Sequence, residues 1–235
     1  MTKQIAVALV LLAGLGMAAS ACQIKIQAGG EAVFGAPVVL TVDVIQEHSN
    51  CVTPIEATKF TLSGLDVVSY TAWKKVSTTS YRMTLTVSPT WVGEVGIEVR
   101  RDCIKYGPQV KELYFEAALG LDTVQKTLPT ATKLVPLGGS VYQVSDRDGK
   151  DLGRVHIVEG TSPTLDFQLL VAVGSSRRVR GLLFLTPNDV PPQTLGDFLA
   201  RFSGMSLAEL HQAPAMTGYE ALSQAIVDAL QRLFS

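Results

Sequence analysis

A regular alternation of apolar and polar side chains is the feature that most restricts the fold of this chain. Between Ala36 and Ala118, the segments 38–44, 81–87 and 95–99 carry apolar residues at every second position, with polar, charged or small residues between them. Successive side chains of a strand point to opposite faces of a sheet, whereas a helix repeats every 3.6 residues. The pattern therefore predicts half-buried β-strands over these three segments.

The first half of the chain resembles an immunoglobulin-like β-sandwich, which we predict over residues 23–120. Its short strands recur at intervals of roughly 8–12 residues with Gly and Pro between them, and a pair of cysteines, Cys51 and Cys103, could join two sheets. Immunoglobulin domains also bury a Trp between their cysteines, and Trp73 and Trp91 are the candidates, although neither has the usual spacing. Nothing in this half indicates catalysis, so we expect it to serve binding, spacing or docking.

The first 21 residues have the pattern of a bacterial secretory signal peptide. Lys3 provides a positive charge, Ile5 to Leu15 an apolar core, and Ala18 to Ala21 a cleavage zone of small residues. The sequence Ala-Ser-Ala-Cys resembles a lipobox, in which Cys22 becomes the lipidated first residue of the mature protein. The alternative is cleavage of the same bond by the ordinary signal peptidase. Either way the protein is predicted to be exported to the periplasm or cell envelope, and with lipidation it is anchored to a membrane.

The number of cysteines supports lipidation of Cys22. The chain has three cysteines, and an odd cysteine in an exported protein requires an explanation. With lipid on Cys22, we expect Cys51 and Cys103 to form a disulfide, which would stabilise the protein by about 4 kcal/mol in the chain-entropy model. The alternative is that all three are free thiols.

The composition excludes several classes of protein. Hydrophobic residues make up 47% and charged residues 17% of the 235, which is not the signature of a disordered chain. Lys and Arg number 20 against 21 Asp and Glu, so the net charge of −1 gives no field suited to nucleic acid. After Cys22, no apolar run reaches the ~20 residues that a transmembrane helix needs.

The pattern changes after residue 120. Residues 121–134 are polar and lose the alternation, which predicts an interdomain linker. Residues 141–144 and 153–158 predict one hairpin, with a turn at Asp148-Gly149, and 166–173 and 179–185 predict a second. Residues 194–202 and 206–210 predict short helices, and an apolar i, i+3, i+4, i+7 pattern from 222 to 233 predicts a C-terminal helix. Strands followed by helices indicate an α+β domain over residues 135–235.

Several short motifs follow one another in a fixed order between residues 139 and 233. These are Val141-Tyr142, Asp148-Gly149, Leu152-Gly153, Thr186-Pro187, Leu195-Gly196 with Phe198, Phe202-Ser203-Gly204, and Ala215-Met216-Thr217 followed by Ala221-Leu222. Mainly by this order, the second half resembles the FMN-binding domain family, which occurs in the flavin subunits of sodium-pumping NADH:quinone reductases, of Rnf-type electron-transport complexes and of related nitrous-oxide regulators. In the family, the last stretch reads S-G-A-T-x-T-S-x-A-V.

The resemblance implies that FMN is the cofactor and that Thr217, at the position of the family's S-G-A-T threonine, carries it through a phosphoester bond. A hydroxyl at a helix start would place the phosphate where free N–H groups and the helix dipole favour an anion. The predicted cofactor-binding residues are Thr186, Leu195, Gly196, Met216, Thr217, Gly218 and Tyr219. The alternative is that Thr217 and Glu220 form a capping box for the C-terminal helix without any ligand. Arg177, Arg178 and Arg180 could meet the phosphate or could lie on the solvated face of a hairpin.

No other motif indicates catalysis. The chain lacks the P-loop, H-E-x-x-H, C-x-x-C and G-x-S-x-G patterns, and its three His suggest neither a catalytic triad nor a metal site. We therefore predict no catalytic residue and no metal ligand. The sequence predicts an exported FMN-binding protein of extracytoplasmic electron transfer rather than an enzyme with its own substrate. The alternative is a flavin-free envelope lipoprotein whose domains dock or bind a partner protein.

Overall fold

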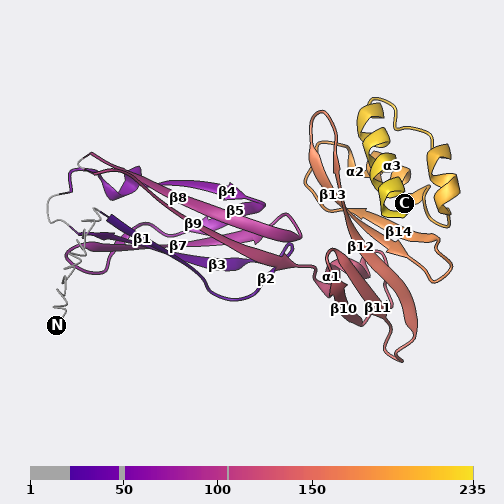
Figure 1. The fold of residues 1–235 in the computed structure, drawn as a ribbon, viewed down its shortest axis with the longest axis horizontal. Helices are drawn as coiled ribbons and strands as arrows, with labels where there is room; N and C mark the ends of the chain where they lie inside the picture. The colour runs from indigo at the N-terminus through magenta and orange to yellow at the C-terminus, as the bar shows by residue number, and fades with distance from the viewer. Residues whose placement is uncertain (1–21, 48–50, 105, 235) are drawn as a thin grey trace, which may run out of the picture.

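The computed structural model describes residues 22–47, 51–104 and 106–234, so the predicted signal peptide lies outside the described residues. The described chain is mostly β-structure arranged in three sheets, with helices near the C-terminus (Figure 1). Among the described residues, no helix is long and apolar enough to cross a membrane.

The first sheet has the strand order β1-β3-β7-β5, with the short β6 also paired to β7. Its strands are antiparallel, and Val42 of β3 lies opposite Met83 of β7. The strands predicted over 38–44 and 81–87 are confirmed. The bounds are Cys22–Ala28 for β1, Val38–Gln46 for β3, Leu65–Tyr70 for β5, Lys74–Lys75 for β6 and Ser80–Pro89 for β7.

The second sheet has the order β2-β9-β8-β4, in which only β2 and β9 are parallel. The strand predicted over 95–99 is confirmed as the centre of β8. The bounds are Ala32–Val33 for β2, Lys59–Ser63 for β4, Gly93–Cys103 for β8 and Gly107–Ala118 for β9, and the 3₁₀ helix η1, Ile55–Ala57, precedes β4.

These two sheets share one hydrophobic core. Leu40, Val42 and Val44 of the first sheet are fully buried in the same cluster as Ile97 and Val99 of the second. This burial follows from the alternation, because every second side chain of each strand points toward the facing sheet. Both Trp candidates lie at the margin of this core and are only partly buried. Trp73 stacks on Phe60 with ring centroids 6.3 Å apart.

The segment predicted as a linker is folded. Residues Leu121–Gln125 form helix α1, and Val124, Leu128 and Ala131 are buried in a cluster that also contains residues of the third sheet. Only Val124 belongs to α1, because Leu128 and Ala131 lie in the turns that follow the helix. The apolar residues of this segment keep neither a strand nor a helix period, so local pattern does not indicate that they are buried.

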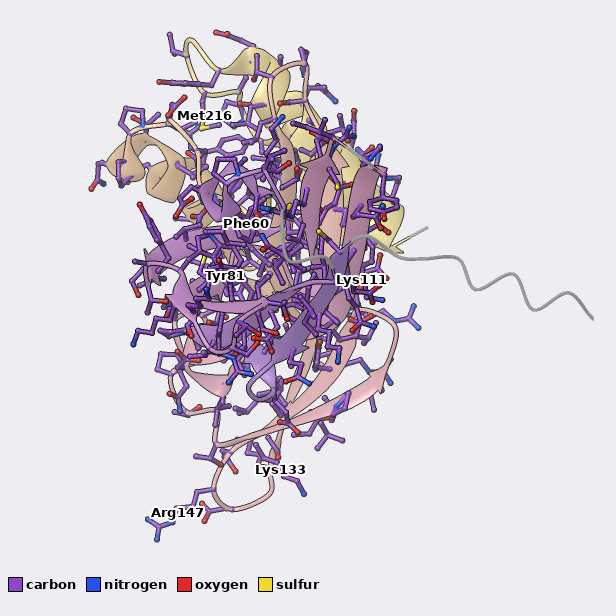
Figure 2. All side chains as sticks on the ribbon, turned by 90° about the vertical axis from the view of Figure 1, so that its left-hand side faces the viewer. Phe60, Tyr81, Lys111, Lys133, Arg147 and Met216 are labelled. Atoms are coloured by element: carbon purple, nitrogen blue, oxygen red, sulfur yellow. The ribbon has the colours of Figure 1, made fainter. Side chains whose placement is uncertain are left out.

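The third sheet is an antiparallel meander in the order β10-β11-β12-β13-β14. Both predicted hairpins are confirmed, β11 with β12 and β13 with β14. Figure 2 shows Arg147 at the tip of the first hairpin, pointing away from the protein. The bounds are Lys133–Gly138 for β10, Val141–Ser145 for β11, Asp151–Thr161 for β12, Asp166–Val173 for β13 and Val179–Phe184 for β14.

Strand β13 is buried on both faces. Phe167, Leu169 and Val171 contact the cluster beneath the helices, whereas Leu170 and Ala172 contact the cluster that includes α1. The helices α2 (Pro192–Ala200), η2 (Leu207–Gln212) and α3 (Glu220–Phe234) therefore cover one face of this sheet (Figure 1). These elements confirm the three helical segments predicted near the C-terminus.

Candidate functional site

The predicted flavin attachment point lies in the turn that precedes α3. The side chain of Thr217 is exposed, and α3 begins three residues later, at Glu220. Gly218 has a φ of +81°, which lies outside the right-handed helical region, so the helix cannot extend back to Thr217. Both alternatives for Thr217 expected it at the start of the helix, and α3 begins three residues beyond it, so Thr217 and Glu220 do not form the capping box.

The start of α3 already holds an anion. The N–H of Gly218 donates to Oε1 of Glu220 at 2.9 Å, and this hydrogen bond is the main reason why the pKa of the Glu220 carboxyl is lowered. Two further bonds fix the turn. The N–H of Met216 donates to Oγ of Ser223, and that hydroxyl donates to the carbonyl of Tyr219, each at 2.9 Å. A carboxylate thus occupies part of the position that a flavin phosphate would need.

A pocket of about 660 Å³ opens beside this turn. Tyr219 and Leu222 line one side of it, and Leu165 and Val190 add apolar surface from two loops of the third sheet. Its charged lining residues, Asp189 and Glu220, are both acidic. The complete lining is Thr164, Leu165, Pro187, Asn188, Asp189, Val190, Gly218, Tyr219, Glu220, Ala221 and Leu222.

The structure brings only part of the predicted cofactor set to this pocket. Gly218 and Tyr219 line it, and Thr217 precedes them in the chain. Leu195 and Met216 are buried in the core beneath the helices. The other two lie elsewhere: the hydroxyl of Thr186 accepts the N–H of Gln168 at 2.8 Å, and Gly196 is exposed on α2.

The three arginines of the β13–β14 hairpin have other partners or positions. Arg178 donates to the carbonyl of Gly204 and forms an ion pair with Glu209 at 3.3 Å, and Arg180 donates to the carbonyl of Leu152. Arg177 lines a separate pocket beside β12. None of the three lines the pocket at α3, so they do not supply a positive charge for a phosphate there.

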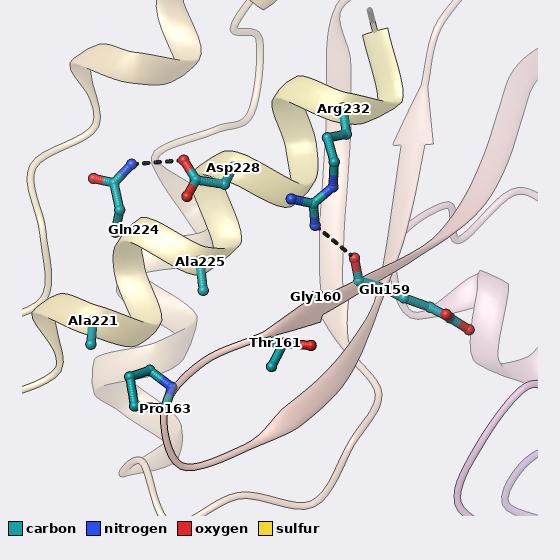
Figure 3. A pocket seen from close by; sticks show the side chains of 9 residues that line it. All are labelled: Glu159, Gly160, Thr161, Pro163, Ala221, Gln224, Ala225, Asp228 and Arg232. Carbon is teal, nitrogen blue, oxygen red and sulfur yellow. Dashed lines mark hydrogen bonds between the residues drawn. The ribbon is translucent and has the colours of Figure 1, made fainter.

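A second hollow of about 490 Å³ lies on the other side of Ala221, between α3 and the end of β12 (Figure 3). It has a shallow floor of small residues, Gly160, Ala221 and Ala225. Arg232 closes one end by donating to the carbonyl of Glu159 at 3.2 Å. Ala221 lines both hollows, so the two lie next to each other along the first turns of α3.

These residues fit FMN in two respects. The larger pocket has the volume and the mainly apolar lining of small-molecule sites, and Tyr219 offers an aromatic ring against which a flavin could stack. The N-terminus of the 15-residue α3 can stabilise a phosphate once the Glu220 carboxylate moves away, and this side chain is free to move because it is exposed.

A second cluster of reactive groups lies far from this pocket. The Sγ atoms of Cys22, Cys51 and Cys103 all lie within 4.8 Å of one another, and we call these residues the cysteine cluster. No disulfide joins any two of these three cysteines in the structure, so the disulfide between Cys51 and Cys103 stays a prediction. Cys22 is only 3% exposed as the first residue of β1. A lipid on its sulfur would have to emerge from this buried position, and lipidation also stays a prediction.

The guanidinium of Arg101 lies against the cysteine cluster and is completely buried. Its Nη2 donates to Sγ of Cys51 at 3.6 Å. Burial by itself raises the pKa of the Cys51 thiol, but hydrogen bonds from Arg101 and from the backbone at Thr53 outweigh it, so the net pKa is lowered. Burial raises the pKa of Cys22. Sequence pattern pairs Cys51 with Cys103 but does not indicate that Cys22 and Arg101 join them, because these residues are far apart in the chain.

Neither a scan against protein-family models nor a search of curated proteins finds a match for this chain.

Proposed function

We propose that this protein is an exported FMN-binding protein that serves in extracytoplasmic electron transfer. The observation that supports this best is the pocket at the start of α3, where Tyr219 and an exposed Thr217 lie together beside a helix N-terminus. The order of family-like features over residues 139 to 233 provides independent support. FMN, when bound, would supply the electron-carrying chemistry, and the protein would bind and orient it.

Thr217 and five of the residues that line the pocket have definite roles in this proposal. The hydroxyl of Thr217 is the attachment point for the phosphate, and the N–H groups at the start of α3 hold its negative charge. Tyr219, Leu165 and Val190 exclude water from the flavin ring. Asp189 and Glu220 favour the oxidised, neutral ring over an anionic reduced ring, because carboxylates close to a developing negative charge oppose it.

The proposal assigns different roles to the two halves of the chain. Residues 135–235 form the α+β FMN-binding-like domain, and residues 23–120 form an immunoglobulin-like sandwich that spaces it from the membrane or docks a partner. A lipid on Cys22 would anchor the protein to a membrane, whereas cleavage of the same bond by the ordinary signal peptidase would leave the Cys22 thiol unmodified. The redox partner is another protein of the envelope.

The test is to export the full chain in a host that supplies a flavin transferase, to denature the product, and to record flavin absorbance and intact mass. We expect colour that stays with the unfolded chain, with an added mass that Thr217→Ala removes. Thr161→Ala, a change of a threonine in the neighbouring hollow, is the matched control and should keep the flavin. Colour that is released on unfolding would mean noncovalent binding. Protein that is colourless and does not bind added FMN would overturn the proposal.

The second candidate is a flavin-free envelope protein that docks a partner. The bond from the Gly218 N–H to Glu220 favours it, because the protein's own carboxylate takes the place of the phosphate. Glu220→Gln separates the two candidates. If FMN and Glu220 compete for the same N–H groups, the variant should bind added FMN more tightly than the original protein. If the site is not a flavin site, neither protein will bind FMN.

A further inference from the structure

The cysteine cluster brings together three segments that are distant in the chain. It lies where β1 begins and β8 ends, at the end of the two-sheet part that faces away from the helices (Figure 1). Cys22 begins β1 in the first sheet, and Cys103 ends β8 in the second sheet. Gln46, near the end of β3, lies opposite Cys22, so the chain leaves β3 beside the cluster and returns to it at Cys51. The fold itself therefore assembles the three sulfurs, without any sequence motif.

The spacing of the sulfurs suits a single metal ion. Zn²⁺ binds thiolates at about 2.3 Å, and two thiolates on one tetrahedral ion are about 3.8 Å apart. The observed limit of 4.8 Å between the thiol sulfurs differs from this by about one ångström, which rotation of the side chains can provide. Three soft sulfur donors select Zn²⁺ or Cu⁺ over hard cations such as Mg²⁺ and Ca²⁺.

The surroundings of Arg101 supply a second, independent observation. Arg101 is 0% exposed, and its Nε has no hydrogen-bond partner. Within residues 22–47, 51–104 and 106–234, no carboxylate forms an ion pair with it. A buried and unpaired cation is costly, so an anion beside it is expected. The groups beside this guanidinium that can carry negative charge are sulfurs of the cluster. Cys51 accepts a hydrogen bond from it, and although burial raises the pKa of Cys22 more, a side-chain hydrogen bond from Arg101 lowers that pKa.

The balance of charge then favours a divalent ion. Three thiolates carry −3 and Zn²⁺ carries +2, so the complex has a net charge of −1, which the guanidinium of Arg101 neutralises. Cu⁺ with three thiolates would leave a net negative charge in the same buried site. Each thiol that coordinates releases its proton to solvent, and no electron is transferred.

We propose that the cysteine cluster is a three-thiolate site for Zn²⁺, with Arg101 as its buried counter-charge. Cys22 and Cys103 are buried and Cys51 is partly exposed, so the ion enters on the Cys51 side, where a water or an external ligand takes the fourth position. The site joins the two sheets with a metal in place of a disulfide. It is independent of the proposed flavin pocket, and it requires that Cys22 carries no lipid.

The first test examines the exported full chain as it is isolated. Its intact mass should be that of a chain with three free thiols or of the same chain with one Zn²⁺. A diacylglyceryl group on Cys22, or the loss of two hydrogens through a disulfide, would overturn the proposal. FMN attachment changes the mass by a different amount, so this outcome is distinguishable from success or failure of the proposed function.

The second test uses metal-free protein under reducing, oxygen-free conditions and Co²⁺ as a spectroscopic probe. We expect saturation at one Co²⁺ per chain, a thiolate-to-metal charge-transfer band in the near ultraviolet, and displacement of the probe by Zn²⁺. Each single Cys→Ser variant should lose the band. Asp102→Asn is the matched control, because this exposed carboxylate next to Cys103 is where adventitious binding would occur, and its removal should leave the band unchanged.

The result does not depend on whether the variants fold. In the unchanged protein, Zn²⁺ should protect all three thiols from an alkylating reagent and should raise the thermal unfolding midpoint. If Co²⁺ gives no thiolate band, or if Zn²⁺ leaves the rate of alkylation unchanged, the proposal is wrong.

Discussion

At the scale of single residues, Arg101 shows how one inward-facing charge organises a loop. It lies on the buried face of β8, in register with Val99 and Cys103, where alternation predicts an apolar residue. Its guanidinium instead donates to the carbonyls of Thr53 and Pro54 at 2.5 and 2.8 Å. These bonds hold the segment that connects Cys51 to η1. The irregularity was visible in the sequence as an Arg within an apolar pattern.

Replacement of Arg101 should therefore be costly. Arg101→Met keeps the length of the side chain but leaves the buried carbonyls of Thr53 and Pro54 without donors, and we expect a loss of about 3 kcal/mol in the free energy of unfolding. Urea denaturation of metal-free, reduced protein measures it. Arg100→Met is the control, because this neighbour is exposed and its pairing with Asp102 should contribute less than about 1 kcal/mol. Equal losses in the two variants would contradict the assigned role of Arg101.

At the scale of secondary-structure elements, alternation was sufficient to predict β3, β7 and β8, because each has one face in a core. The second of the later hairpins is indicated by its turn residues instead, since β13 is buried on both faces and does not alternate. Alternation could not reveal which cysteines meet, since contact among residues 22, 51 and 103 depends on how the sheets pair and not on local pattern. The apolar period also predicted that α3 exists but not where it begins. The positive φ of Gly218 prevents the helix from starting earlier, and this backbone angle cannot be read from the apolar period.

The first residues of β12 show how closely this strand is positioned by its neighbour β13. Gly153 has a φ of +114°, and a Cβ there would overlap the carbonyl oxygen of Val173 on β13. Gly153→Ala should therefore lower the free energy of unfolding by about 3 kcal/mol, from strain and overlap together. Gly149→Ala in the same hairpin is the control. Its φ is +79° with open space around it, so only the strain of about 1 kcal/mol applies. Chemical denaturation of both variants measures the two losses in the free energy of unfolding. Similar losses would show that the Val173 carbonyl moves aside at little cost.

At the scale of the whole molecule, the two-sheet part and the third sheet are joined by a packed interface. Gln168 of β13 is completely buried, and its side-chain amide both accepts from the N–H of Val92 and donates to its carbonyl, each at 2.8 Å. Val92 and Leu119 belong to the same buried cluster as Leu170 and Ala172. Because this cluster draws on both parts, loss of either part exposes apolar surface of the other, and the two should unfold together.

Gln168→Leu should uncouple this unfolding. The variant leaves the buried N–H and carbonyl of Val92 unpaired, at a cost of about 2 kcal/mol or more, and that cost falls on the interface rather than on either core. The chain offers two separate probes. Both Trp residues, Trp73 and Trp91, lie in the two-sheet part, whereas helical circular dichroism reports mainly on α2 and α3. In the original protein the two thermal transitions should coincide, and in the variant they should separate. Gln193→Leu, on the exposed face of α2, should leave them coincident. If the transitions also coincide in Gln168→Leu, the interface does not depend on this amide, and the shared apolar cluster alone couples the two parts.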